Sequence, residues 1–223
     1  MQSPLQDPTA YKDLKKKDYY DRIYNFLKEN RINNLLDVGG AAGAFGWFAP
    51  EHINILSIDI SQDLIDIGNS RKTKNNLKYQ QGDILKDNFG LFDLVTVFGA
   101  LSTFEDIESA IKCICNHSKK HLIIQTISTP YPFDVKVKHR NYNNKEKDYQ
   151  SLFNIYSLEY IRDLLNKMNF SKVRYEKYVM NNFLEEGPKN KLRNFNVKIN
   201  NVVKTTNQLG IIFDEILIFA ERD

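Results

Sequence analysis

The sequence contains few cysteines and little net charge. Its two cysteines, Cys113 and Cys115, stand two residues apart, and no further cysteine or paired histidine completes a set of metal ligands. We therefore expect buried or half-buried free thiols and no metal site. The net charge of +3 over 223 residues is too small to indicate a nucleic-acid-binding domain, which is normally much more basic.

The sequence also has no apolar run of membrane-spanning length, and its first eight residues do not read as the apolar core of a signal peptide. We therefore expect a cytoplasmic protein that binds no membrane. Internal repeats and Gly/Ser-rich linkers are likewise missing. With 42% hydrophobic and 26% charged residues, the chain has the composition and length of one globular domain with a single core.

Short apolar segments alternate with helical patterns along most of the chain, which predicts an α/β fold with a parallel sheet and helices on both faces. The predicted helices cover 9–30, 64–67 (opened by Ser61), 105–117 and 157–168. The predicted strands are 34–38, 53–59, 77–80, 92–98, 121–126, 172–180 and 211–220. Residues 128–154 show little periodicity and are predicted to be a long polar and aromatic loop. The connection 181–209 is so long that we expect it to be functional or to cover another part of the protein.

A turn of small residues follows the first predicted strand: residues 37–43 read Asp-Val-Gly-Gly-Ala-Ala-Gly. Glycine permits backbone dihedrals that other residues resist, and its small size lets a ligand approach the backbone closely. Ligands bind at the carboxyl ends of strands in open α/β sheets, where this turn lies. Taken alone, such a turn also fits tight packing between a strand and a helix.

Two further acids end the next predicted strands. Asp59 stands about twenty residues beyond the turn, an offset that suits a carboxylate accepting hydrogen bonds from ribose hydroxyls. Asp83 follows the third strand. Their apolar neighbours Ile60 and Ile84 are candidates to enclose a flat adenine ring.

This arrangement resembles the class I S-adenosylmethionine-dependent methyltransferase family, well over residues 34–127 and loosely elsewhere. The family motif has the form acid-x-Gly-x-Gly-x-Gly, whereas here alanine replaces the middle glycine, as Asp37-x-Gly39-x-Ala41-x-Gly43. The resemblance implies S-adenosylmethionine as cofactor, with a three-layer, Rossmann-like sandwich around a mixed seven-stranded sheet whose last strand is antiparallel. It further implies the roles of single residues: Gly39 and Gly43 beside the methionine moiety, Asp59 at the ribose, Asp83 at the adenine amino group, and the Phe98-Gly99 backbone at the cofactor's ammonium.

Three other classes of enzyme fit the sequence less well. A nicotinamide-dependent oxidoreductase needs Gly-x-Gly-x-x-Gly, and no start position in residues 37–46 supplies that spacing. Metal-dependent catechol-type transfer needs acids after the fourth strand, where residues 98–101 have none. The same position lacks the Asn/Asp-Pro-Pro-aromatic motif of enzymes that methylate DNA bases or glutamine amides.

The acceptor is expected at the same sheet edge, beyond the fourth and fifth strands. His139 lies there among polar and aromatic residues and is the candidate base, although a loop histidine is otherwise a solvated surface group. Tyr131, Arg140 and Tyr156 are candidate acceptor-binding residues. Arg140 would pair with an anionic acceptor, or it belongs to a solvated basic face with its neighbours. Tyr156 would line the pocket, or it is a core aromatic beside a helix N-cap.

We therefore predict a single methyltransferase domain that transfers a methyl group to a small molecule, favouring a sugar or glycan-precursor hydroxyl. Within it, 1–33 would form a helical cap, with Tyr19 and Tyr20 as a lid over the cofactor or as core residues. Residues 34–127 would bind the cofactor, 128–209 would bind the acceptor, and 210–223 would form the last strand. N-methylation of an amino sugar or other small amine is the nearest alternative. A cofactor-binding module without turnover is an alternative of another class.

Overall fold

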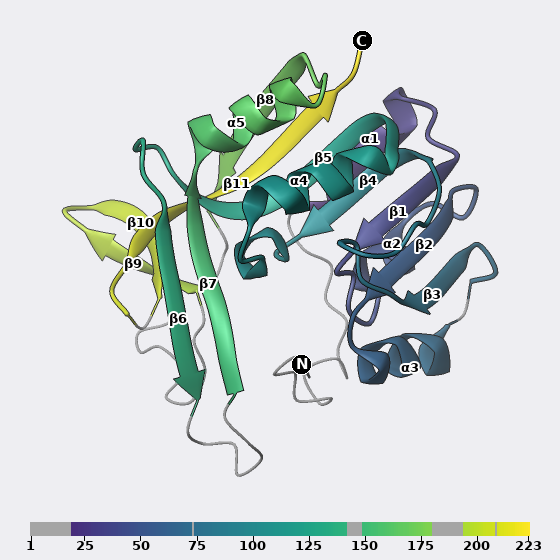
Figure 1. Cartoon of the computed structure of the whole chain (residues 1–223), viewed down its shortest axis with the longest axis horizontal. Coiled ribbons are helices and arrows are strands. Elements are labelled where there is room, and N and C mark those ends of the chain that lie inside the picture. The colour runs from purple at the N-terminus through teal and green to yellow at the C-terminus, as the bar shows by residue number, and fades with distance from the viewer. Residues whose placement is uncertain (1–18, 73, 142–148, 180–193, 208) are drawn as a thin grey trace.

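A computed structural model describes residues 19–72, 74–141, 149–179, 194–207 and 209–223 (Figure 1). Its helices are α1 (Tyr20–Glu29), α2 (Ala44–Phe48), α3 (Gln62–Arg71), α4 (Ile107–Asn116) and α5 (Leu158–Lys167), with a 3-10 turn η2 (Leu101–Thr103). Its strands are β1 (Asn34–Val38), β2 (Asn54–Asp59), β3 (Leu77–Gln81), β4 (Phe92–Phe98), β5 (Ser118–Thr129), β6 (Val135–Asn141), β7 (Tyr149–Ser157), β8 (Lys172–Tyr178), β9 (Asn194–Ile199), β10 (Val202–Asn207) and β11 (Ile212–Glu221).

The centre of the protein is a mixed sheet in the order β3-β2-β1-β4-β5-β11-β8. The first five of these strands are parallel to one another, whereas β11 runs antiparallel to both β5 and β8. This confirms the predicted mixed sheet with an antiparallel last strand. In the described part of the chain, the β6–β7 and β9–β10 hairpins extend this seven-stranded core.

Helices cover both faces of the sheet because successive side chains of each buried strand point to opposite sides. On one face, Leu35, Leu94 and Leu217 pack in a cluster that includes residues of α1, α2 and α3. On the other face, Leu36 and Val95 pack against α4 and α5. The result is the predicted three-layer sandwich. Of the predicted first helix, residues 9–18 lie outside the described part.

The prediction of a loop over 128–154 was wrong, because β6 and β7 form a long antiparallel hairpin that projects from the sheet (Figure 1). The alternation of Val135 and Val137 with lysines is a strand pattern that the loop interpretation overlooked. β7 reaches the central sheet only at its end, where Tyr156 pairs with Ser128 of β5.

The connection 181–209 also contains structure. β9 and β10 form a hairpin whose turn residues, Asn200 and Asn201, have φ angles of 49° and 64°. Asparagine tolerates this left-handed backbone, which two-residue hairpin turns require. β10 then pairs with β11, so this hairpin lies at the same end of the sheet as the β6–β7 hairpin (Figure 1).

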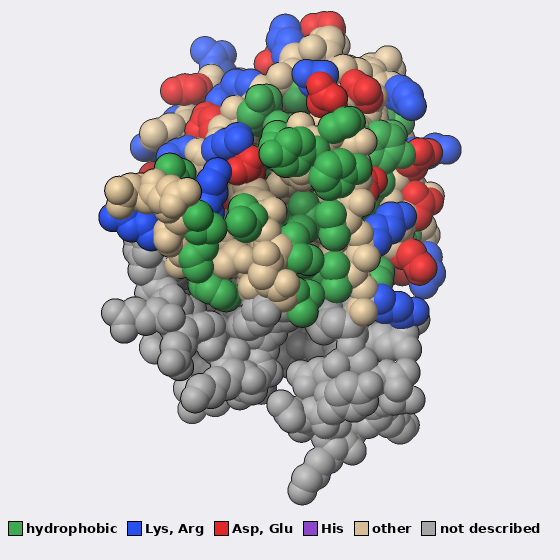
Figure 2. Space-filling view, turned by 90° about the vertical axis from the view of Figure 1, so that its left-hand side faces the viewer, with side chains coloured by type: hydrophobic (Ala, Val, Ile, Leu, Met, Phe, Trp, Pro, Cys, Tyr) green, Lys and Arg blue, Asp and Glu red, His purple; other side chains and the backbone are tan. Residues whose placement is uncertain are grey.

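Hydrophobic side chains gather on the face of the protein shown in Figure 2, and charged residues surround them at its upper edges. On the β9–β10 hairpin and the start of β11, Ile199, Val202 and Ile212 are 43%, 53% and 51% exposed. None of the described helices has the length and apolar character needed to span a bilayer.

Candidate functional site

The turn after β1 has an unusual backbone. Gly39, Ala41 and Gly43 all have positive φ angles, of 67°, 51° and 74°. The N–H of Gly40 donates to the carbonyl of Ile58 in β2 at 3.1 Å, and the N–H of Gly43 donates back to the carbonyl of Gly40 at 2.7 Å. These bonds close the turn against the neighbouring strand.

Glycine is required at two positions of this turn by its surroundings as well as by φ. A Cβ on Gly39 would stand 2.7 Å from the Cβ of Ala100, at the end of β4. A Cβ on Gly43 would fall on the ring of Tyr79, whose hydroxyl accepts a hydrogen bond from Trp47 Nε1 at 2.6 Å. The turn therefore lies in close contact with the ends of β3 and β4.

Asp37 lies beneath the turn and is 1% exposed. Its Oδ1 accepts a hydrogen bond from Thr96 Oγ1 at 2.9 Å, and its Oδ2 accepts one from Ser57 Oγ at 3.4 Å. Burial raises the pKa of this carboxyl to about 7, although both hydrogen bonds act in the opposite direction. In this structure Asp37, the acid of the motif, therefore links β1 to β2 and β4 beneath the turn.

Asp59 is the acid nearest the open side of the turn. Its Oδ2 accepts a hydrogen bond from the N–H of Ala41 at 3.1 Å, and its Oδ1 accepts one from the N–H of Ser61 at 2.9 Å. Burial raises the pKa of Asp59, and these backbone bonds oppose the shift. A carboxylate has about four acceptor positions, so both oxygens retain room for ribose hydroxyls.

The residues expected around the adenine differ in exposure. Ile60 is 55% exposed, whereas Ile84 is 5% exposed and belongs to the core cluster beneath α4. Asp83 accepts a hydrogen bond from the N–H of Leu85 at 3.0 Å and forms an ion pair with Lys86 at 2.9 Å. Ile60 therefore provides most of the apolar surface at this position.

The end of β4 lies at the same edge of the sheet as the glycine turn. Gly99 has a φ of 73°, and its N–H donates to the carbonyl of Gln125 at 2.9 Å. Its own carbonyl accepts a hydrogen bond from Ser102 Oγ at 3.3 Å and retains a second lone pair. Phe98 is half-buried and packs against Phe45 of α2, with ring centroids 5.0 Å apart.

Taken together, these residues fit the implied cofactor. The glycine turn lets a ligand approach the backbone, and the carboxylate of Asp59 stands beside it where ribose hydroxyls would bind. The carbonyl of Gly99, at the same edge of the sheet, would accept a hydrogen bond from an ammonium group. Among the described residues, no group of His, Cys, Asp or Glu side chains forms a candidate metal site.

The two N-terminal tyrosines lie in the core. Tyr19 and Tyr20 are 8% and 4% exposed, and both rings contact Phe98 at centroid distances of 5.6 and 6.1 Å. They cover the end of β4 from the side of α1.

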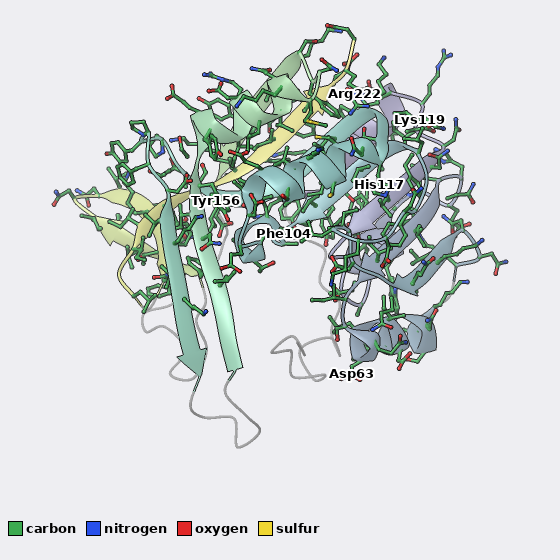
Figure 3. All side chains as sticks on the ribbon, viewed as in Figure 1. Asp63, Phe104, His117, Lys119, Tyr156 and Arg222 are labelled. Atoms are coloured by element: carbon green, nitrogen blue, oxygen red, sulfur yellow. The ribbon has the colours of Figure 1, made fainter. Side chains whose placement is uncertain are left out.

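Two of the predicted acceptor-binding residues lie in different surroundings. Tyr131, after β5, is 60% exposed and its ring is parallel to that of Phe133, with centroids 5.6 Å apart. Tyr156 is fully buried, and its hydroxyl donates to the carbonyl of Phe104 at 2.6 Å, where β7 meets the segment after β4 (Figure 3). Since Tyr156 presents no surface to a ligand, it is a core residue in this structure and not part of a pocket wall.

His139 and Arg140 lie on the outer part of β6, where they pair with Ser151 and Gln150 of β7. Their side chains lie outside the described part of the structure. The backbone register alone places them away from the point where the hairpin joins the sheet.

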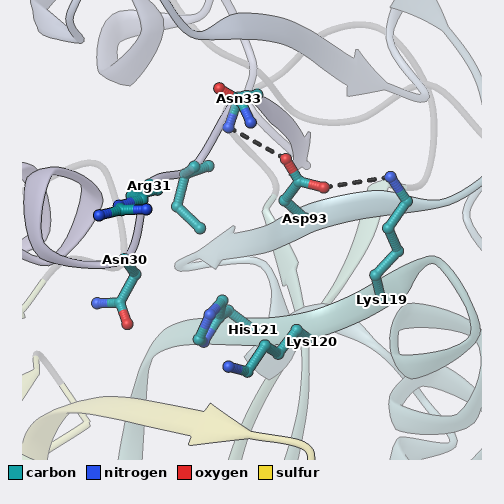
Figure 4. A pocket seen from close by; sticks show the side chains of 8 residues that line it. Asn30, Arg31, Asn33, Asp93, Lys119, Lys120 and His121 are labelled. Carbon is teal, nitrogen blue, oxygen red and sulfur yellow. Dashed lines mark hydrogen bonds and ion pairs between the residues drawn. The ribbon is translucent and has the colours of Figure 1, made fainter.

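A separate polar pocket of about 310 Å³ lies at the opposite edge of the sheet, at the amino ends of β1, β4 and β5 (Figure 4). Its lining includes Arg31, Lys120 and His121, together with Asp93, which is paired with Lys119 at 3.2 Å. It does not adjoin the glycine turn.

Comparison with protein families and solved structures agrees with this geometry. Residues 12–175 match the family described as "Methyltransferase domain". A comparison with curated protein sequences finds no match.

Many solved structures share the fold, and three of them illustrate the low sequence identity. The N-terminal domain of EvdMO1 with SAH bound is 12% identical, with 93% of this chain and 82% of that chain covered and a TM-score of 0.65. The same domain in the presence of SAH and D-fucose is 12% identical, with coverages of 99% and 85% and a TM-score of 0.63. An S-adenosylmethionine-dependent methyltransferase from Clostridium acetobutylicum ATCC 824 is 16% identical, with coverages of 96% and 94% and a TM-score of 0.59.

The family match spans most of the chain, and the acid-glycine turn, the strand order and the antiparallel last strand agree with it. The chain therefore belongs to the methyltransferase-domain family and is a class I S-adenosylmethionine-dependent methyltransferase.

Proposed function

We propose that this methyltransferase acts on a hydroxyl group of a small sugar or glycan precursor. The observation that carries the proposal is the exposed, parallel pair of rings formed by Tyr131 and Phe133 beyond β5. The two rings form a contiguous exposed aromatic surface, and an aromatic ring offers a flat apolar body that matches the C–H face of a sugar ring. The EvdMO1 domain, which has the same fold, was studied in the presence of D-fucose.

The cofactor supplies a methyl group on a positively charged sulfur. In this assignment the turn from Gly39 to Gly43, Asp59 and the Gly99 carbonyl would hold the cofactor. The remaining work of the protein is to place the acceptor oxygen in line with the methyl group, since positioning supplies much of the acceleration in such transfers.

Neutral polar side chains surround the start of the acceptor region. Ser128, Thr129 and Asn154 are 1%, 6% and 1% exposed. Asn154 Nδ2 donates to the carbonyl of Phe104 at 2.8 Å, while its Oδ1 has no hydrogen-bond partner among the described residues. Like Tyr156, these side chains present almost no surface to a ligand, so they support the frame of the acceptor region and do not line the acceptor site.

The basic residues of β6 support a second feature of the proposal, an anionic acceptor such as a sugar phosphate or a nucleotide-linked sugar. Lys136 and Lys138 are exposed, and Arg140 follows on the same strand. His139, the base predicted from the sequence, lies on the same strand and is tested separately below.

The test is a screen of neutral sugars, sugar phosphates, nucleotide sugars and amino sugars with methyl-labelled S-adenosylmethionine. We expect label in a sugar hydroxyl and better turnover with the phosphorylated members. Tyr131→Ala should raise the acceptor KM about tenfold with the cofactor Kd unchanged. Tyr175→Ala, at a tyrosine of β8 that is 49% exposed, is the matched control. Label on nitrogen only would replace this proposal with amine methylation, and no label in any sugar would reject it.

A further inference from the structure

The polar pocket at the amino edge of the sheet takes no part in the cofactor site. Its volume is about 310 Å³, and its walls come from the turn between α1 and β1 and from the starts of β4 and β5. Figure 4 shows Asn30 and Arg31 on one side of the pocket and Lys120 and His121 on the other. Small-molecule sites have volumes of about 300–1,000 Å³, so this pocket has room for a small metabolite.

Arg31 lines this pocket from a backbone conformation that is uncommon for an arginine. Its φ is 51°, in the left-handed region, and residues held in that region cluster at functional sites. Its side chain is exposed, and no carboxylate of the described residues forms an ion pair with it. A guanidinium group is a planar fork of N–H donors that matches the oxygens of a phosphate or a carboxylate. Arg31 is therefore a cation that is available to an anionic ligand.

Asp93, at the start of β4, holds the turn that carries Arg31. Its Oδ2 accepts hydrogen bonds from the N–H groups of Asn33 at 3.1 Å and Asn34 at 3.3 Å, and its Oδ1 is paired with Lys119 at 3.2 Å. In return, the N–H of Asp93 donates to Asn34 Oδ1 at 2.7 Å. The turn is thus fixed to β4 without a ligand, which lowers the entropy cost of binding one.

His121 forms the buried wall of the pocket. It is 4% exposed, and its ring lies edge-on to that of Phe26, with centroids 5.2 Å apart. Burial lowers the pKa of His121, so the imidazole is neutral at pH 7. Its Nδ1 has no hydrogen-bond partner in the part of the chain that the structure describes. Buried polar groups are normally paired, so this wall favours a polar occupant over an apolar one.

The charges around the pocket indicate the sign and size of the ligand charge. The charged lining residues are three cations and one acid, a net charge of +2: Arg31, Lys119, Lys120 and Asp93. Lys120 is paired with Glu221 Oε1 at 3.2 Å, but Lys172 lies 3.4 Å from the same oxygen. Lys120 can therefore turn toward a ligand without leaving Glu221 unpaired. A phosphate monoester carries close to two negative charges at pH 7, whereas a simple carboxylate carries one.

We propose that this pocket binds the phosphate group of a small phosphorylated metabolite. The guanidinium of Arg31 contacts two phosphate oxygens, and the ammonium group of Lys120 supplies a second positive charge. Because the pocket lies at the opposite edge of the sheet from the glycine turn, its ligand is not the methyl acceptor. The cofactor and this ligand bind at the same time.

The first test is calorimetry with inorganic phosphate, glycerol 3-phosphate and acetate at a fixed ionic strength of about 0.15 M, where surface charges are largely screened. We expect one site per chain with a Kd below about 1 mM for glycerol 3-phosphate, and acetate at least tenfold weaker. Arg31→Ala should weaken glycerol 3-phosphate at least tenfold, and Arg31→Lys, which keeps the charge without the fork, at least threefold.

Arg162→Ala is the matched control, because Arg162 is an exposed arginine of α5 outside this pocket. It should bind glycerol 3-phosphate like the original protein. An equal loss in Arg162→Ala and Arg31→Ala would reveal unspecific attraction between charges and would overturn the proposal. The absence of saturable phosphate binding, or acetate binding of equal strength, would also overturn it.

Arg140→Ala separates this pocket from the acceptor region, where a sugar phosphate is also proposed to bind. We expect Arg140→Ala to retain the affinity for glycerol 3-phosphate that Arg31→Ala loses. The reverse result would assign the phosphate to the β6–β7 hairpin and reject the pocket. No methyl transfer is measured here, so a failed sugar screen and a failed phosphate titration are distinguishable results.

Nuclear magnetic resonance locates the ligand in the original protein. When glycerol 3-phosphate is added to the ¹⁵N-labelled chain, the amide signals of residues 30–33 and 119–121 should move most. The signals of residues 37–43, in the glycine turn, should stay in place, and added SAH should then move them as in the protein without phosphate. If the largest changes fall instead on residues 37–43 or 135–141, the proposal is wrong.

Discussion

Asp59 accepts a hydrogen bond from the backbone N–H of Ala41, with 3.1 Å between Oδ2 and the nitrogen. This bond joins the end of β2 to the middle of the glycine turn, at the one motif position where alanine replaces glycine. The acid that is expected to hold the ribose therefore also fixes the shape of the turn that contacts the methionine moiety. Cofactor binding and turn geometry depend on the same carboxylate.

Asp59→Ala removes both roles, so we expect S-adenosylmethionine to bind at least tenfold more weakly, a loss of about 1.4 kcal/mol. Isothermal calorimetry gives the Kd directly. Asp63→Ala, in the exposed first turn of α3, is the control and should leave the Kd unchanged. Unaltered affinity in Asp59→Ala would remove Asp59 from the cofactor site.

Ala41→Gly tests the departure from the family motif. Ala41 has a φ of 51°, a backbone region that costs a residue with a Cβ roughly 1 kcal/mol. Glycine removes that strain, but it adds disorder to the unfolded chain worth about 0.4–1 kcal/mol. We expect the free energy of unfolding in urea to change by less than about 1 kcal/mol and the cofactor Kd to stay within threefold. A larger fall in the free energy of unfolding, or a larger rise in the cofactor Kd, would show that the alanine methyl group has a role of its own.

The sequence predicted the parallel core of the sheet well because its strands are buried on both faces and read as short apolar runs. β1 and β4 match the predicted bounds 34–38 and 92–98, and the positions of the turn, Asp59 and Asp83 at the carboxyl edge follow from strand order alone. β5 extends further than the predicted 121–126, because its ends carry polar residues such as Ser118 and Thr129 that form no apolar run.

The acceptor side was harder to predict, because its structure depends on contacts between segments far apart in the chain. The burial of Glu215 in β11, which is 2% exposed, is not evident from the apolar pattern of its strand, because it depends on the pairing with Tyr178 of β8. The burial of Tyr156 follows from its contact with Phe104, which is 52 residues away in sequence. Periodicity within one segment does not reveal such contacts.

Gly43→Ala should destabilise the protein strongly, because the new methyl group would have to displace the Tyr79 ring and adopt a φ of 74°. We expect a loss of about 2–4 kcal/mol in the free energy of unfolding, measured in urea. Gly90→Ala is the matched control, since Gly90 has a φ of 86° with no atom within 4 Å of a built Cβ. Because that control carries only the backbone cost, a similar loss in both variants would show that contact with Tyr79 is unimportant.

Asp37→Asn should change how stability depends on pH. Burial raises the pKa of Asp37 to about 7 in the folded protein, above its unfolded value near 3.8. Between these values the folded state holds a proton that the unfolded state has lost, so the contribution of Asp37 is fully present below pH 4 and is lost as pH rises through 7. One proton gives a slope of at most about 1.4 kcal/mol per pH unit.

We therefore expect urea unfolding between pH 4 and 8 to show the original protein losing stability relative to Asp37→Asn as pH rises. Asp93→Asn should show the opposite pH dependence of stability. Hydrogen bonds from the N–H groups of Asn33 and Asn34, together with Lys119, hold the pKa of Asp93 below its usual value despite partial burial. Its contribution should be lost only as pH falls below about 4. Parallel curves for the original protein and Asp37→Asn would contradict the raised pKa.

His139→Ala tests the catalytic base predicted from the sequence. If His139 takes the acceptor proton, this variant should lower kcat about 100-fold or more with the cofactor Kd unchanged, and the pH–rate profile should lose a limb near the histidine pKa of about 6.5. From the position of β6 we expect a smaller effect, with kcat within about tenfold and any larger change confined to the acceptor KM. Lys138→Ala, the preceding residue on the strand, controls for the loss of charge from the hairpin. A 100-fold loss of kcat in His139→Ala would instead support His139 as the base and show that β6 reaches the cofactor edge during turnover.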